Sequence, residues 1–131
     1  MTNILSVANQ KGGVGKTTTA VNTSAVLSGS GRKVLLIDLD PQANATMGSG
    51  IDKHKLENSI YELLLGTEEI NSVLKKTRFG YDLLPSNRDL IGAELDLVDA
   101  NDREYRLSNQ ISKLSFQYDF IIIDCPPSLS L

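Results

Sequence analysis

The sequence predicts an α/β fold, with a mostly parallel sheet and helices on both of its faces. Short, near-continuous apolar runs alternate along the chain with segments of helical periodicity. Glycine-rich or proline-containing turns separate the two kinds of segment. Apolar residues make up 40% and charged residues 22% of the 131 residues, which is the balance of an ordinary globular domain.

The front of the chain predicts one parallel crossover unit. NILSVA (3–8) is apolar and rich in β-branched residues, and we expect a buried strand that leads into a glycine loop. Small and apolar residues at helical spacing predict a helix over 16–28, which two glycines end. KVLLIDLD (33–40) predicts a second strand that is covered on both faces.

The middle of the chain predicts four helices and one strand. Helical periodicity indicates helices at 59–66, 68–76, 88–98 and 102–114. We expect Asp102 to cap the last of these helices. YDLLPSN (81–87) is expected to be a strand that ends in a loop at Pro85. We assign no site to residues 59–117.

YDFIIIDCPPS (118–128) predicts a strongly apolar last strand that runs out into an aspartate and two prolines. We expect this strand to lie in the centre of the parallel sheet. A central strand needs further strands and helices to cover it, and the chain ends three residues after Ser128. We therefore expect residues 1–131 to be the N-terminal part of a single domain whose C-terminal part is absent from this chain.

Composition excludes several classes of protein. No run of about 18 apolar residues is present, so no membrane-spanning helix is predicted, and the amino terminus does not read as a signal peptide. The single cysteine, Cys125, cannot form an internal disulfide, which suits a reducing cytosol. A net charge of -3 argues against a dedicated nucleic-acid module.

The stretch SVANQKGGVGKTTTAVN (6–22) predicts a phosphate-binding loop between a strand and a helix. Its glycines allow successive N–H groups to point inward at phosphate oxygens, and the helix start adds the positive end of its dipole. Lys16 is placed to reach the β- and γ-phosphates, Thr17 to ligate Mg²⁺, and Thr18 to contact the α-phosphate. The alternative is a plain glycine turn.

Three aspartates follow predicted strands at the edge of the sheet that carries this loop. Asp38 and Asp40 come at the end of the second strand, where alternation sends both side chains the same way. Asp124 ends the last strand. Phosphoryl transfer needs a metal, positioned charge and an oriented water. Carboxylates beside a phosphate loop can hold the metal, supply the charge and orient the water.

The loop departs from the standard G-x-x-x-x-G-K-[ST] pattern, because Gln10 replaces its first glycine and Lys11 adds a second cation. From spacing alone, Lys11 is equally well a solvated surface residue. KGGVGKTT, however, resembles the deviant Walker A motif of the ParA/MinD superfamily of P-loop ATPases, which includes the nitrogenase iron protein. The resemblance implies a three-layer P-loop NTPase fold. It also implies that Lys11 reaches across an ATP-sandwich dimer to the phosphates of the partner subunit.

The same resemblance assigns roles to the site residues. DLDPQANAT resembles switch I of ParA-type proteins, in which Asp40 would orient the attacking water and Asp38 would support the magnesium shell. DCPPS resembles switch II, with Asp124 as the Walker B aspartate that holds a Mg²⁺-bound water. Lys11, Lys16 and Asp40 are thus the expected catalytic residues, and Thr17, Asp38 and Asp124 the expected metal site. The expected nucleotide-binding residues are Lys11, Gly12, Gly13, Val14, Gly15, Lys16, Thr17 and Thr18.

Within the superfamily, the three motifs most resemble the chromosome-partitioning ParA branch, often called Soj. This implies a cytoplasmic, nucleoid-associated protein that binds ATP and Mg²⁺, forms a homodimer and hydrolyses ATP. It also implies non-specific binding of chromosome or plasmid DNA through the missing C-terminal part, and stimulation by a ParB-type centromere-binding partner. No membrane association is expected.

Other interpretations stay open at this stage. One is a MinD-like ATPase that cycles on a membrane during cell division, and another is a non-catalytic scaffold that binds ATP only to drive association. Asp40 argues against the scaffold, because a binding switch has no use for a carboxylate that orients water. We interpret Cys125 as a packing residue rather than a reactive thiol or cluster ligand, and His54, the only histidine, as exposed.

Overall fold

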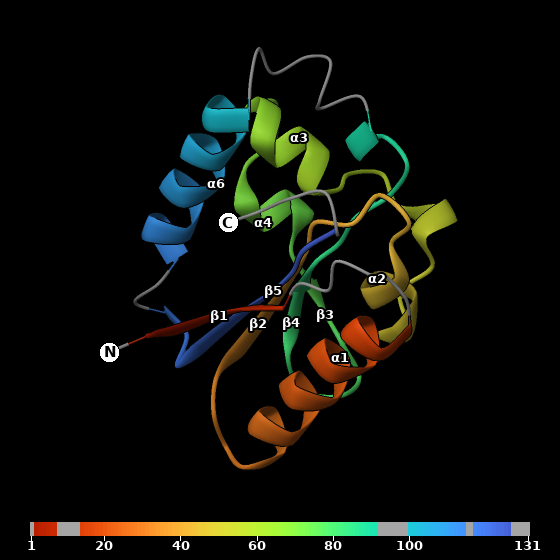
Figure 1. Ribbon diagram of the computed structural model, residues 1–131, viewed down its shortest axis with the longest axis vertical. Helices are drawn as coiled ribbons and strands as arrows, with labels where there is room; N and C mark the ends of the chain where they lie inside the picture. Colours follow the sequence, from red (N-terminus) through yellow and green to blue (C-terminus); the bar gives the residue numbers. More distant parts are fainter. Residues whose placement is uncertain (1, 8–13, 92–99, 115–116, 127–131) are drawn as a thin grey trace.

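The computed structural model describes residues 2–7, 14–91, 100–114 and 117–126, which form one five-stranded sheet and its covering helices (Figure 1). The strand order is β1-β5-β2-β4-β3. The strands are β1 (Asn3–Val7), β2 (Val34–Asp38), β3 (Lys75–Lys76), β4 (Asp82–Leu84) and β5 (Phe120–Asp124). All neighbouring pairs are parallel except β3 and β4. The last strand is central, between β1 and β2, as predicted.

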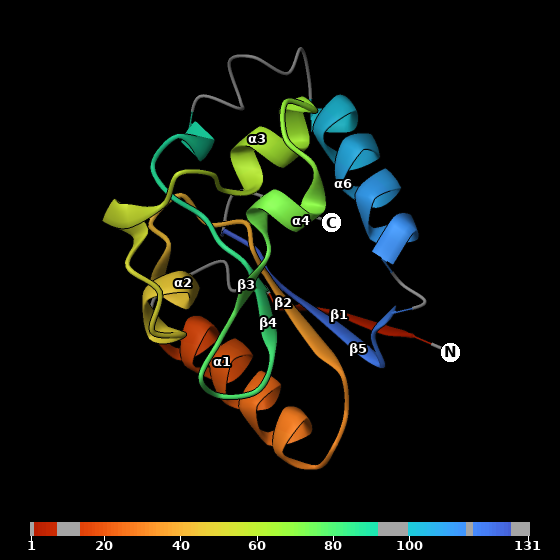
Figure 2. The same ribbon diagram turned by 180° about the vertical axis from the view of Figure 1, so that it is seen from behind.

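Helices cover both faces of the sheet, so the fold has three layers. The α-helices are α1 (Val14–Gly29), α2 (Asn44–Gly48), α3 (Ile60–Leu65), α4 (Ile70–Val73) and α6 (Ala100–Leu114), and a 3-10 turn, η1, spans Lys53–Lys55. Figures 1 and 2 show α1 and α2 on one side of the sheet and α3, α4 and α6 on the other. Within the described residues, no helix is long and apolar enough to cross a membrane.

Alternation along β2 and β5 divides the core between the two faces. Leu36 and Ile122 pack in a cluster with Ala20 of α1 and Ala45 of α2. The side chains one position away on each strand pack in the larger cluster with α3, α4 and α6. Because every second residue of a strand points to the same face, Asp38 and Asp124 also lie on the side of α1.

Local signals explain both ends of α3 and the end of α1. Ser59 and Glu62 form a reciprocal capping box at the start of α3, and Gly66 ends it with a left-handed φ of 80°. The helix predicted over 59–66 is therefore confirmed. The helix predicted over 16–28 is also confirmed as α1, and Gly31 follows it with a φ of 89°.

Three structural predictions are wrong in detail. β1 is not buried: Ile4 and Leu5 are 49% and 44% exposed, because β1 lies at the edge of the sheet and pairs only with β5.

The helix predicted over 68–76 stops at Val73, because Lys75 and Lys76 pair with β4 instead. α6 has already begun at Ala100, so Asp102 lies inside the helix and does not cap it. Most of the helix predicted over 88–98 lies outside the described residues.

Gly80 lies in the turn between β3 and β4, and we expect its replacement by alanine to destabilise the fold by about 1–2 kcal/mol. Its φ of +100° strains any residue with a Cβ atom, and an added Cβ would lie 2.5 Å from Ser28 Oγ. The measurement is the free energy of unfolding in urea. Gly29→Ala is the matched control, because nothing lies within 4 Å of its added Cβ. Equal effects of the two substitutions would contradict this reading of the turn.

Candidate functional site

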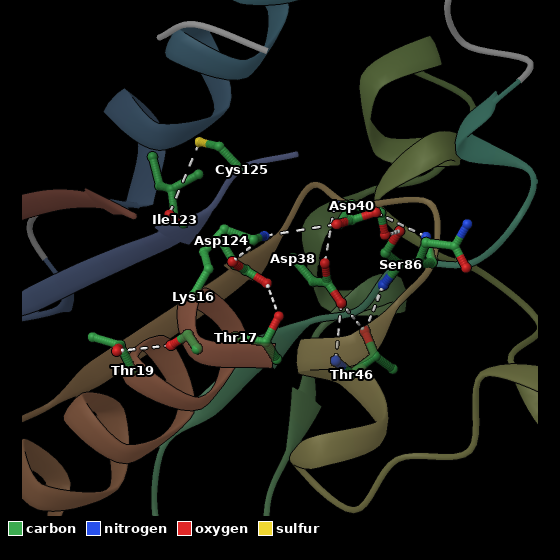
Figure 3. Close-up of polar contacts among 12 residues, drawn as sticks. Lys16, Thr17, Thr19, Asp38, Asp40, Thr46, Ser86, Ile123, Asp124 and Cys125 are labelled. Atoms are coloured by element: carbon green, nitrogen blue, oxygen red, sulfur yellow. Dashed lines mark hydrogen bonds and ion pairs between the residues drawn. The ribbon is translucent and has the colours of Figure 1, made fainter. Parts of the chain in front are cut away.

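The polar side chains that the sequence singles out meet at the carboxyl edge of the sheet (Figure 3). Asp38 of β2 pairs in register with Asp124 of β5. Both strands run parallel, so their carboxyl ends reach the same edge, and both aspartates point toward the face that α1 covers. The first turn of α1 brings Lys16 and Thr17 to the same place. Crossover geometry therefore assembles one ammonium and two carboxylates from three elements.

Lys16 lies buried between two carboxylates. Its Nζ is 2.6 Å from Asp124 Oδ1 and 3.6 Å from Asp40 Oδ2, and its side chain is only 2% exposed. Thr17 Oγ1 donates a longer hydrogen bond, of 3.4 Å, to Asp124 Oδ2. Burial raises the pKa of Asp124, and the neighbouring ammonium opposes that rise. A buried ammonium is stable only beside opposite charge, so Lys16 and Asp124 depend on each other in this arrangement.

Asp38 accepts three hydrogen bonds at the end of β2. Its Oδ1 accepts from the Asp40 N–H at 3.0 Å, and its Oδ2 accepts from the N–H and the hydroxyl of Thr46 at 2.9 and 2.7 Å. The N-cap residue of α2, Ala43, has no capping side chain and has a left-handed φ of 59°. Asp38 therefore takes a backbone N–H that an N-cap side chain usually takes. Its carboxylate fixes α2 to the sheet.

Asp40 leaves the strand and faces Lys16. Its Oδ1 accepts from the Gln42 N–H at 3.0 Å, and its backbone carbonyl accepts from Ser86 Oγ at 2.7 Å. Its second oxygen, Oδ2, lies 3.6 Å from the Lys16 ammonium. The side chain is 12% exposed, at the rim of the site. Asp38 and Asp40 thus have different surroundings: both oxygens of the Asp38 carboxylate accept hydrogen bonds, whereas the second oxygen of Asp40 faces the Lys16 ammonium.

Thr46 and Ser86 are fully buried at this edge and are not among the site residues predicted from the sequence. Thr46 lies within the DPQANAT block, and its hydroxyl also accepts from the Ser86 N–H at 2.9 Å. Ser86 follows β4, the next parallel strand after β2 in the sheet. The rule that selected Asp38 and Asp124, polar residues just after a parallel strand, therefore also selects Ser86.

The other predicted site residues are placed as follows. Lys11, Gly12 and Gly13 lie outside the described residues, and Val14 opens α1. Gly15 and Thr18 are exposed in the first turns of α1. Their contacts with a nucleotide stay predictions.

The two residues interpreted as having no site role are in keeping with that interpretation. Cys125 is buried in the larger core cluster, and burial raises the pKa of its thiol to about 11. A thiol of high pKa in an apolar setting is inert, which suits a packing residue. His54 is exposed in η1.

The donor set fits a triphosphate with a hard divalent cation. Lys16 supplies a buried ammonium beside the N-terminal end of α1, where phosphate oxygens are favoured. Thr17 and Asp124 supply adjacent hydroxyl and carboxylate oxygens, which are the ligands that Mg²⁺ prefers. In the described part of the chain no group of three or more His, Cys, Asp or Glu side chains could hold a metal by itself. The fit therefore includes the oxygens of the phosphates and of water.

We expect Asp38 to make stability depend on pH. Burial raises its pKa from 3.8 to about 7, so over this range the folded protein binds a proton that the unfolded chain releases. The contribution of Asp38 to stability is complete below pH 3.8 and is lost as the pH rises to about 7. Asp38→Asn removes this titration. Relative to that variant, the free energy of unfolding of the wild type should decrease as the pH rises from 3.8 to about 7.

The measurement for Asp38 is urea unfolding of both proteins at a series of pH values, in buffer with a chelator. The pKa of Asp124 is also raised, but that residue is present in both proteins and largely cancels in the difference. Parallel curves for the two proteins would show that Asp38 does not titrate in this range.

Comparison with known proteins agrees with the geometry of the site. A family model described as an AAA domain matches residues 2–131. The chromosome partitioning protein ParA of Myxococcus xanthus is 48% identical over 129 residues, which cover 98% of this chain and 46% of that protein. The sporulation initiation inhibitor protein Soj of Bacillus subtilis is 46% identical over 132 residues, which cover 100% of this chain and 52% of Soj. The chain therefore spans about half the length of the curated relatives it matches.

A solved structure shares the fold closely. Cobyrinic acid a,c-diamide synthase from Mycobacterium smegmatis, with bound ADP and magnesium, is 51% identical and has a TM-score of 0.92. The match covers 98% of this chain and 52% of that one. The same protein has also been crystallised with an ATP analogue and magnesium. The chain therefore belongs to the ParA/MinD superfamily of P-loop ATPases and is most similar to its partitioning branch, as the family model, these identities and the common fold show.

Proposed function

We propose that this chain forms the N-terminal part of a ParA-type ATPase domain that binds and hydrolyses ATP with Mg²⁺ to segregate DNA. The observation that carries the proposal is the buried Lys16 ammonium, 2.6 Å from Asp124 and 3.6 Å from Asp40 at the start of α1. Such a cation is placed to exchange its carboxylate partner for phosphate oxygens. The mycobacterial relative with bound ADP and magnesium supports this choice of ligand.

In this proposal each side chain of the site has one task. Lys16 binds the β- and γ-phosphates, together with the amides and side chains of the loop from Lys11 to Thr18. Mg²⁺, when bound, neutralises charge on the phosphates. Thr17 and Asp124 would hold the cation when it is bound. Asp40 orients the attacking water, because its second oxygen faces Lys16 at the rim of the site. Asp38 supports this arrangement through the backbone of Asp40.

The assembly steps belong to the intact protein. We propose that two copies close over two nucleotides and that Lys11 of each copy reaches the phosphates bound to the other. The dimer then binds DNA non-specifically through the part of the domain that is absent from this chain. A ParB-type partner stimulates hydrolysis and releases the DNA. The name of the Myxococcus relative, chromosome partitioning protein ParA, supports the partitioning role and favours it over a MinD-like membrane cycle.

Nucleotide-dependent sedimentation of the intact protein, with and without DNA, tests the proposed function. The wild type should sediment as a dimer with ATP and Mg²⁺, and should bind DNA only in that state. Lys16→Ala should stay monomeric because it does not hold the nucleotide. Lys11→Ala should bind ATP without forming the dimer. Lys76→Ala, a change at a side chain that is 88% exposed, is the control and should behave as the wild type. A dimer that forms equally with and without nucleotide would contradict the proposal.

A further inference from the structure

The hydroxyl of Thr46 stands at the centre of a buried chain of hydrogen bonds. Thr46 Oγ1 donates to Asp38 Oδ2 at 2.7 Å and accepts from the Ser86 N–H at 2.9 Å (Figure 3). A peptide N–H can only donate, so Ser86 supplies the proton of its own bond and the hydroxyl proton of Thr46 is directed at Asp38. All three residues are fully buried, so these donors and acceptors have no water to replace a lost partner.

The two residues that bond to the Thr46 hydroxyl, Asp38 and Ser86, hold both sides of Asp40. Asp38 Oδ1 accepts from the Asp40 N–H at 3.0 Å, and Ser86 Oγ donates to the Asp40 carbonyl at 2.7 Å. The backbone of Asp40 is therefore fixed from two directions, by groups that meet at one hydroxyl. The carboxylate that projects from this backbone lies 3.6 Å from Lys16 Nζ.

We propose that Thr46 is a positioning residue for ATP hydrolysis, and that its hydroxyl fixes Asp38 and Ser86 and through them the direction of the Asp40 carboxylate. Thr46 itself contacts no reacting atom. The inference rests on the proposed function, because it needs Asp40 to orient the attacking water. A catalytic group displaced by about 1 Å can cost about 100-fold in rate, so a hydroxyl remote from the reaction can control turnover without controlling binding.

The alternative is that Thr46 only packs α2 against the sheet. Thr46→Val keeps the shape of the side chain and removes the hydroxyl, whereas Thr46→Ser keeps the hydroxyl and removes the methyl group. If the hydroxyl positions Asp40, Thr46→Val lowers kcat by about 10- to 100-fold and changes the Kd for ATP by less than about twofold. Thr46→Ser then restores kcat. If packing alone matters, Thr46→Ser is the more damaging change.

The experiment measures ATP turnover and, separately, the Kd for a non-hydrolysable ATP analogue with Mg²⁺, both with the intact protein. Thr67→Val, at an exposed threonine beyond the end of α3, is the matched control and should leave both values unchanged. A double-mutant cycle adds Asp38→Asn. Because Thr46 acts in part through Asp38, the combined loss of kcat should be smaller than the sum of the two single losses in free energy. Additive losses, or an unchanged kcat in Thr46→Val, would overturn the inference.

The outcomes separate this inference from the proposed function. If the wild type hydrolyses ATP and Thr46→Val does so with the same kcat, only the role of Thr46 is wrong. If the wild type binds no ATP and turns none over, the proposed function is wrong and the inference falls with it. Should Thr46→Val not fold, Asp38→Asn gives the same reading from the other end of the hydrogen bond. An unchanged kcat in that variant would also overturn the role of Thr46.

Discussion

Replacing Lys16 by alanine in the intact protein is expected to weaken the binding of ATP with Mg²⁺ by about 100-fold or more. Hydrogen bonds to charged groups contribute about 1.5–3 kcal/mol each, and about 1.4 kcal/mol corresponds to a tenfold change in Kd. The Lys16 ammonium is buried at the start of α1, where it can meet two phosphate groups. No other described lysine lies within ion-pair distance of Asp40 or Asp124. Isothermal titration calorimetry measures the effect.

The same substitution removes the partner of a buried carboxylate, so stability has to be separated from binding. Asp124 is fully buried, and the loss of its ammonium partner is expected to destabilise the fold by about 3 kcal/mol. Adding Asp124→Asn to Lys16→Ala removes the unpaired charge and should restore much of that stability. It should not restore binding of the nucleotide. A folded Lys16→Ala protein with wild-type affinity would contradict the role given to this lysine.

Replacing Asp40 by asparagine is expected to lower ATP turnover by about 100- to 1000-fold and to leave ATP affinity within a few-fold of the wild type. Asparagine keeps an oxygen for the Gln42 N–H, which donates to Asp40 Oδ1 at 3.0 Å. It removes the negative charge that would orient and polarise the attacking water. Binding is expected to persist, because Lys16 and the phosphate loop are unchanged. The measurement is phosphate release under saturating ATP.

A matched control for Asp40 is available at the surface of the same edge of the fold. Asp89→Asn makes the same chemical change at an exposed carboxylate after β4, and it should leave turnover unchanged. If Asp40→Asn turned over ATP at the wild-type rate, the scaffold interpretation would gain, because hydrolysis would not need this carboxylate. If it instead abolished binding, Asp40 would belong to the nucleotide site rather than to the reaction.

The parts of the fold that the sequence predicts well are those set by local patterns. The apolar runs that end at Asp38 and Asp124 are β2 and β5, and the helix between β1 and β2 ends at Gly29, as its glycines predict. The exposure of β1 could not be predicted, because an apolar run has the same pattern at an edge as in the centre of a sheet. Lys75 and Lys76 continue a helical pattern in the sequence, but pairing with β4 outweighs that local preference.

In the candidate site, too, local patterns predict some of the residues and not others. The rule that polar residues gather at the carboxyl ends of parallel strands predicts that Asp38 and Asp124 come together, and the structure pairs them in register. Strand alternation does not describe Asp40, because β2 ends at Asp38 and the chain then turns so that the Asp40 N–H bonds back to Asp38. The bonds of Thr46 and Ser86 depend on where α2 lies relative to β4. No local pattern contains that information.

The most direct test of where the nucleotide binds is a crystal structure of the intact protein with a non-hydrolysable ATP analogue and Mg²⁺. We expect Lys16 Nζ to have left Asp124 Oδ1, now 2.6 Å away, and to lie about 2.8 Å from oxygens of the β- and γ-phosphates. Thr17 Oγ1 should lie about 2.1 Å from the cation. An analogue bound elsewhere, with the ion pair between Lys16 and Asp124 intact, would contradict the assignment of this edge of the sheet as the nucleotide site.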